Sequence, residues 1–120
     1  MKTLTKAEEQ VMQALWEIGE GFIRDVIEVL PVPKPHQNTV STILKILLDK
    51  EFVAIRQFGR QHQYYPLISK QAYSKATMNT VVKSYFNGSF SDAVSFMVKE
   101  KSISLEDLET LLQQLKKEKK

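Results

Sequence analysis

The residues best suited to chemistry are short polar side chains that recur at helical spacing between residues 38 and 49. Asn38, Ser41, Thr42, Lys45 and Asp49 lie on one stripe of the helix that this spacing predicts. Amides and small hydroxyls favour helix less than Glu, Lys or Gln, so an ordinary solvated face does not explain them. At the exposed start of a helix they can approach a duplex and bond phosphates and base edges. From this segment alone, an alternative stays open in which these residues only cap the helix and cover a surface without a binding function.

A hairpin is predicted directly after this helix. Residues 52–58 are rich in β-branched and aromatic side chains, Gly59 supplies the turn, and residues 61–66 form the returning strand. Its tip is Gly59-Arg60, and the flanking Arg56, His62 and Gln63 add cations and amides that suit contact with a phosphate backbone. The alternative that these are ordinary surface cations on a hairpin that does not bind DNA is also open.

The elements that position these residues are two helices upstream. Thr5 and Glu8 have capping-box spacing, and an apolar helical period continues over residues 6–18 until Gly19. A second short helix follows over residues 23–30 and ends at Pro31. The proline-rich stretch 31–35 is interpreted as a stiff connection, although a polyproline ligand has the same composition.

Three helices and then a hairpin is the element order of a winged helix-turn-helix domain, which we place at residues 1–67. Charge agrees with this order, because residues 34–66 carry five Lys or Arg side chains against only Asp49 and Glu51. The net charge of +3 is too small to argue for nucleic acid by itself. The side chains predicted to bind DNA are Asn38, Thr39, Ser41, Thr42, Lys45, Arg56, Arg60 and His62.

Residues 68–120 contain three further amphipathic helical runs, so the fold class is mainly α (α+β). These faces exceed what so short a segment can bury, which favours a homodimer over the alternative that they pack back on the first domain. The side chains predicted to form the dimer interface are Val82, Tyr85, Phe86, Phe90, Val94, Met97, Leu108, Leu111 and Leu112.

The residue types in the sequence argue against several classes of function. There is no cysteine, and His36 and His62 are the only imidazoles, so we expect no metal site and no cofactor. No phosphate loop, nucleophile elbow or suggestive carboxylate pair is present, which argues against an enzyme. No apolar run reaches the roughly 20 residues of a membrane span, and the N-terminus lacks a signal-peptide pattern, so we expect a cytoplasmic protein without membrane insertion.

The ordered set of motifs resembles the penicillinase-repressor family over nearly the whole chain. The resembling stretches are residues 4–8 (LTKAE) with Val11, Met12, Leu15 and Trp16, then Thr39, Val40 and Thr42, then Gly59, Arg60, Tyr64, Pro66 and Leu67, and finally residues 104–108 (SLEDL). The resemblance implies a homodimeric repressor of dyad-symmetric operators. It also implies inactivation by cleavage in the C-terminal domain after a membrane sensor, acting with a signalling protease, detects a signal.

The sequence departs from the family pattern at three positions. Glu51 stands where a glycine usually ends the third helix, and Ser41 stands where some members have arginine. Ser95 and Phe96 occupy the place of the Asn-Phe bond that is cut in penicillin-responsive members. We expect release of DNA to act through the C-terminal region, because a winged helix is too small for a ligand cavity of ~300 Å³. A winged-helix scaffold that binds protein without specific DNA binding is the competing function.

Overall fold

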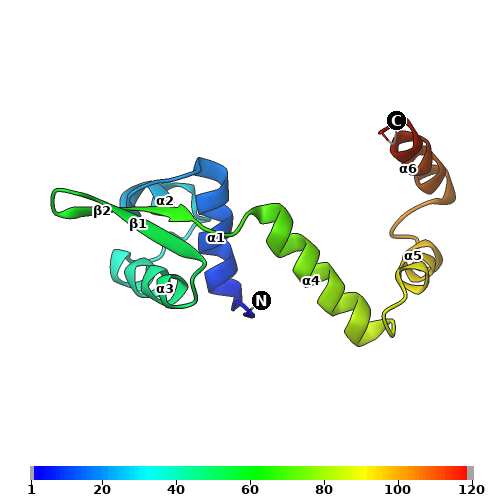
Figure 1. The fold of residues 1–120 in the computed structure, drawn as a ribbon, viewed down its shortest axis with the longest axis horizontal. Helices are drawn as coiled ribbons and strands as arrows, with labels where there is room; N and C mark the ends of the chain where they lie inside the picture. Colours follow the sequence, from blue (N-terminus) through cyan, green and yellow to red (C-terminus); the bar gives the residue numbers. More distant parts are fainter. Residues whose placement is uncertain (1, 119–120) are drawn as a thin grey trace. The chain divides into compact units, whose positions relative to one another are not determined.

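The computed structural model describes residues 2–118, and its elements follow the predicted order (Figure 1). None of the helices in this described range is long and apolar enough to cross a membrane. The elements are α1 (Lys6–Ile18), α2 (Ile23–Val29), α3 (Gln37–Asp49), β1 (Val53–Phe58), β2 (Gln61–Pro66), α4 (Lys70–Tyr85), α5 (Phe90–Lys99) and α6 (Leu105–Glu118). They confirm a winged helix-turn-helix followed by three helices. Residues 1, 119 and 120, which the expected domains include, lie outside the described residues.

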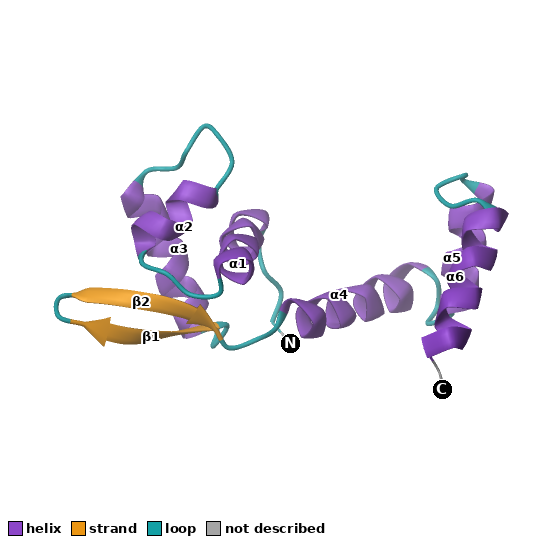
Figure 2. Ribbon diagram, turned by 90° about the horizontal axis from the view of Figure 1, so that it is seen from above, coloured by secondary structure: helices purple, strands orange, loops and turns teal. Residues whose placement is uncertain are grey.

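The first compact unit packs α1, α2 and α3 against the antiparallel hairpin of β1 and β2, which we call the wing. Figures 1 and 2 both show the turn of the wing projecting beyond these helices. The face of α3 opposite its polar stripe packs into the core, since Val40, Leu44 and Leu47 are fully buried. The other fully or almost fully buried core residues are Leu4, Val11, Met12, Ala14, Leu15, Val26, Leu30, Phe52 and Val53.

The start of α1 is tied to the end of α3 by a buried carboxylate. The predicted capping box is confirmed: the Glu8 amide donates to the Thr5 hydroxyl, and the Thr5 amide donates to the Glu8 carboxylate. The Lys50 ammonium also donates to Glu8 at 2.6 Å. This hydrogen bond from Lys50 lowers the pKa of Glu8 below its ordinary value, against the opposing effect of burial.

We expect Glu8→Gln to lower the free energy of unfolding at pH 7 by about 1–3 kcal/mol, because it removes a charge-assisted bond. A carboxylate with a lowered pKa stabilises the fold above its unfolded pKa of about 4.3 and loses that contribution as pH falls through the folded pKa. Urea unfolding from pH 7 to acid should therefore show the difference from the native protein shrinking. Glu17→Gln, an exposed change on the same helix, is the control. A difference that is constant with pH would contradict the ion-pair explanation.

The end of α3 holds an acidic residue in a left-handed conformation. Glu51 has a φ of 64°, where the resembling family usually has glycine. The Phe52 amide donates to the Leu47 carbonyl at 2.9 Å and the Glu51 amide to the Leu48 carbonyl at 3.0 Å, which is a Schellman arrangement. A residue with a Cβ is strained at this φ.

Glu51→Gly should therefore raise the free energy of unfolding by about 0.5–1 kcal/mol, because glycine removes the strain at some cost in chain entropy. Thermal unfolding should show the midpoint rising by several degrees. Glu51→Ala keeps the Cβ and should not stabilise. Equal stabilisation by alanine would mean that the lost carboxylate, and not the backbone conformation, is responsible.

The wing is anchored to the turn between α1 and α2. Gly21 and Tyr64 exchange two backbone hydrogen bonds of 3.0 and 2.7 Å. The Phe22 ring meets Phe58 edge-on at a centroid distance of 6.0 Å. These contacts hold both strands close to the helix-turn-helix, so the orientation of the wing is built into the first unit.

The compact units divide between Ala76 and Thr77, later than the boundary expected after residue 67. The first turns of α4 belong to the first unit because they complete its core. The Trp16 indole donates to the Ile68 carbonyl at 2.9 Å, and the Tyr73 ring lies 5.8 Å from those of both Trp16 and Phe52.

The second unit contains the rest of α4 together with α5 and α6. Two of its helices begin at serine N-caps, since the Ser89 hydroxyl accepts from the Asp92 amide and the Ser104 hydroxyl from the Asp107 amide. Val82 is 2% exposed, and the Phe86 and Phe96 rings lie 5.5 Å apart. Much apolar surface stays exposed on this unit, notably Tyr85, Phe90, Leu105, Leu111, Leu112 and Leu115.

Candidate nucleic-acid interface

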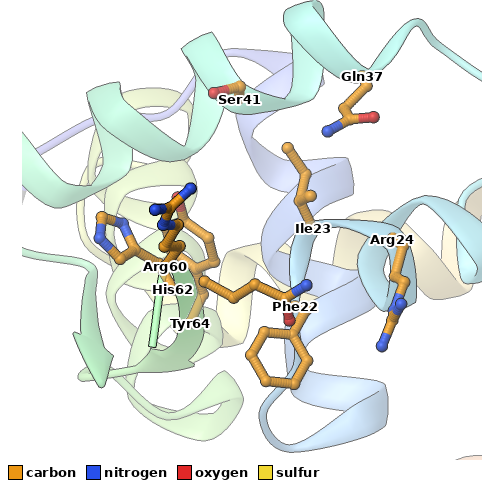
Figure 3. A pocket seen from close by; sticks show the side chains of 9 residues that line it. Phe22, Ile23, Arg24, Gln37, Ser41, Arg60, His62 and Tyr64 are labelled. Carbon is orange, nitrogen blue, oxygen red and sulfur yellow. The ribbon is translucent and has the colours of Figure 1, made fainter. Parts of the chain in front are cut away.

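A cleft of about 390 Å³ lies between α2, α3 and the wing, and we call it the wing cleft. Figure 3 shows Arg60 and His62 on its wing side, Ser41 and Gln37 along α3, and Arg24, at the start of α2, on the side opposite the wing. Its lining contains cations, amides, a hydroxyl and aromatic rings, but no carboxylate: Phe22, Ile23, Arg24, Gln37, Ser41, Arg60, Gln61, His62 and Tyr64.

The expectation that the winged helix has no room for a cavity of this size was wrong. The first unit also holds a groove of about 370 Å³ between α1, α3 and the proline-rich connection. The reason is that the wing and the proline-rich connection stand away from the helical core and enclose open space at its edges, which an estimate from core size does not include.

The first turns of α3 present the predicted polar face to solvent. Asn38, Thr39, Ser41, Thr42 and Lys45 are all exposed. These side chains border two different hollows: Ser41 lines the wing cleft, whereas Thr39 lines the groove beside the proline-rich connection. The helix therefore offers a broad polar surface that extends from the wing to the other side of its own N-terminus.

Two hydrogen bonds define what the start of α3 can offer to a ligand. The Nδ1 atom of His36 accepts the Asn38 amide at 3.0 Å and so caps the helix. The Thr42 hydroxyl donates to the Asn38 carbonyl at 3.0 Å. Since a hydroxyl has one hydrogen, Thr42 can offer an outside group only its acceptor lone pairs and its methyl group.

The wing separates the three residues predicted on it. The register pairs Arg56 with Gln63 and Gln57 with His62, so Arg56 and His62 lie on opposite faces of the hairpin. His62 and Arg60 face the wing cleft. Arg56 instead forms an ion pair with Glu20 and stacks over the Tyr65 ring at 4.3 Å. The structure thus brings Arg60 and His62 to α3 but keeps Arg56 apart.

Other basic residues of the middle segment also bind within the chain. Lys34 donates to the Leu30 carbonyl at 2.8 Å and so caps the C-terminal end of α2, and Lys50 is paired with Glu8. Within residues 2–118, Lys45, Arg60 and Arg24 form no ion pair. The cations available to an external anion are therefore fewer than the composition indicates.

Among the lining residues of the wing cleft that sequence reasoning missed, three have side-chain N–H donors, namely Arg24, Gln37 and Gln61. Gln61 directly follows Arg60, and Gln37 directly precedes Asn38, so continuity with predicted residues could have indicated both. Arg24 lay in a helix interpreted only through its apolar period. A cation one position after the start of an amphipathic helix was the available signal.

The residues predicted for the dimer interface differ in exposure. Tyr85 is 79% exposed and Phe90 54%, whereas Val82 is already buried within its own chain. Leu111 and Leu112 are 43% and 49% exposed, and Met97 is 37% exposed. Phe86, Val94 and Leu108 are half-buried, while Ser95 and Phe96 lie on the exposed surface of α5.

Comparisons with known proteins find both a curated relative and solved structures that resemble this chain. A 78-residue segment is 28% identical to an uncharacterized 16.5 kDa protein in the ptsI 3' region of Latilactobacillus sakei, and covers 63% of this chain and 53% of that protein. The match therefore spans about half of that relative. The CopR repressor structure aligns with 57% of this chain and all of its own, at 29% identity and a TM-score of 0.47.

A second solved structure is BpsR of Bordetella bronchiseptica, described as regulated in DNA binding by 6-hydroxynicotinic acid. It has 20% identity and a TM-score of 0.53, and the alignment covers 84% of this chain and 76% of that one. At this identity the likeness shows the winged-helix fold. The sequence model of the penicillinase repressors matches residues 4–117. This chain therefore belongs to the penicillinase repressor family of DNA-binding transcriptional repressors.

Proposed function

We propose that this protein represses transcription as a homodimer bound to a specific, dyad-symmetric operator. The observation that carries the proposal is the exposed polar face of α3 beside a cleft with cations and no carboxylate in its lining. In helix-turn-helix proteins this helix enters the major groove with its N-terminal residues toward the base edges. The wing then positions the domain on the backbone.

The second unit supports the dimeric half of the proposal. Its exposed aromatic and leucine side chains form an apolar surface that a monomer would leave in water. A two-fold interface covers the same surface on both copies at once. Two linked DNA-binding domains bind two half-sites with much higher affinity than a single domain binds a single half-site.

Selection from a library of random duplexes tests the proposal. We expect enrichment of an inverted repeat whose half-sites are about one or two helical turns apart. Affinity for the enriched duplex should fall with salt by about 0.9 log units per neutralised phosphate per log unit of salt. A protein that enriches no sequence, or whose affinity is flat with salt, would instead fit the scaffold function.

We predict that substitutions on α3 and on the wing have different signatures. Thr42→Ala should weaken binding to the selected operator by about tenfold and change binding to random duplex little, since it removes a base-edge contact. Arg60→Ala should weaken binding to both duplexes and flatten the salt slope by about one unit. Titrations by fluorescence anisotropy on both duplexes measure this. Identical effects of the two substitutions would contradict the separation of reading from positioning.

We further propose that repression ends through the second unit, by cleavage of the Ser95–Phe96 bond by a signalling protease coupled to a membrane sensor. The bond lies inside α5, so cleavage requires local opening of that helix. A cut there separates the paired Phe86 and Phe96 rings into different fragments. Mass spectrometry of the protein from induced cells should show fragments ending near Ser95. Intact protein released from its operator would contradict cleavage.

A further inference from the structure

We propose that the wing cleft holds the sugar-phosphate backbone of one operator strand, with Arg24 of α2 as a phosphate-binding residue at the opposite end from Arg60. This inference rests on the proposed function and adds to it a contact outside α3 and the wing. It also assigns the cleft a ligand class, a phosphodiester chain, in place of a base edge or a small effector.

The first argument is the availability of charge. Arg24 and Arg60 are exposed and form no ion pair within residues 2–118, whereas Arg56 is paired with Glu20. The Arg24 guanidinium lies 5.9 Å from the Phe22 ring, an attraction that leaves its five N–H donors free to bind an anion. A guanidinium in this state matches the oxygens of a phosphate.

The second argument is the chemistry of the lining. Besides the arginines, Gln37, Ser41 and Gln61 offer neutral donors, and the lining contains no carboxylate to repel an anion. Apolar groups separate the two ends, with Ile23 and Phe22 between Arg60 and Arg24 in Figure 3. Charged ends with apolar groups between them fit phosphates joined by a deoxyribose.

The third argument is position. Ser41 belongs both to the exposed face of α3 and to the lining of the cleft. A helix that reads the major groove has a backbone strand along its side, and phosphate contacts fix its register there. The cleft lies along that side of α3, where the strand would run.

The experiment compares four full-length proteins on the duplex obtained by selection: the native chain, Arg24→Gln, Arg60→Gln and Lys75→Gln. Lys75 is an exposed lysine of α4, so its variant matches the change in net charge. We expect Arg24→Gln and Arg60→Gln each to weaken binding by about tenfold and to lower the salt slope by about 0.9. Lys75→Gln should leave the slope unchanged.

A second measurement locates the contact. Duplexes that each carry one neutral methylphosphonate should reveal the phosphates on which the native protein depends. Arg24→Gln should be insensitive to neutralisation at one of these positions, because its contact there is already lost. Circular dichroism should show unchanged helix content, since Arg24 is exposed.

The outcomes separate the inference from the proposed function. If the native protein binds the selected duplex while Arg24→Gln behaves like Lys75→Gln, the phosphate assignment is overturned and the repressor function stands. If Arg24→Gln selects a different sequence, Arg24 reads bases and the backbone assignment is overturned. If the native protein binds no duplex, both fall together.

Discussion

Replacing Leu111 and Leu112 by aspartate should convert the protein to a monomer and weaken binding to a dyad operator by about 100-fold or more. Both side chains are about half exposed in the single chain, at 43% and 49%, so the fold of the chain tolerates the change. In the proposed dimer they lie at the interface, where unpaired carboxylates are costly to bury. Sedimentation at micromolar concentration and titration of the operator measure the two effects.

A matched control places the same charges elsewhere on α6. Thr110→Asp with Gln113→Asp adds two carboxylates on the side of the helix away from the leucine stripe. This variant should remain dimeric. Its affinity for the operator should differ from that of the native protein only by the effect of two added negative charges. A monomeric control would mean that charge on α6 in general dissociates the dimer, and a dimeric aspartate variant of Leu111 and Leu112 would place the interface elsewhere.

Phe52→Ala should lower the free energy of unfolding by about 3–5 kcal/mol, a large part of the stability of a small domain. The side chain is 1% exposed, and its ring packs edge-on against Tyr73 at 5.8 Å. Its backbone receives the Leu67 amide at 2.8 Å and donates to Leu47. The ring therefore fills the space where the end of α3, the wing and the start of α4 meet.

Chemical denaturation followed by circular dichroism measures this loss, and Phe58→Ala is the matched control. Phe58 is the same residue type on the same strand, but it is 53% exposed and contacts Phe22 only at the surface. We expect its replacement to cost about 1 kcal/mol or less. Similar losses for both variants would show that Phe52 does not join these elements as the packing indicates.

The fold was predictable from local signals where those signals are strong. The bounds of α1 follow from the capping box at Thr5 and the stop at Gly19, which has a φ of 84°. The wing follows from β-branched and aromatic residues on both sides of Gly59. In each case the residues that specify the element are its near neighbours in sequence.

The partners of the charged residues were not predictable, because they come from distant positions. The pairing of Lys50 with Glu8 spans 42 residues, and that of Arg56 with Glu20 spans 36. The face of the wing that carries Arg56 depends on the strand register and on where the α1–α2 turn meets it. Composition therefore indicated a basic segment but could not indicate which of its cations are free to bind an anion.

The docking of α4 on the first unit gives the chain an intrinsic optical reporter. Trp16 is the only tryptophan in the sequence, and it bonds the Ile68 carbonyl and packs on Tyr73, both near the start of α4. Detachment of this segment would expose the indole to water and shift its emission to longer wavelength. Trp16 is absent from the lining of the wing cleft, so occupation of that cleft need not alter the signal. Emission from the unlabelled protein can thus follow undocking of α4 while a labelled duplex reports DNA release in the same sample.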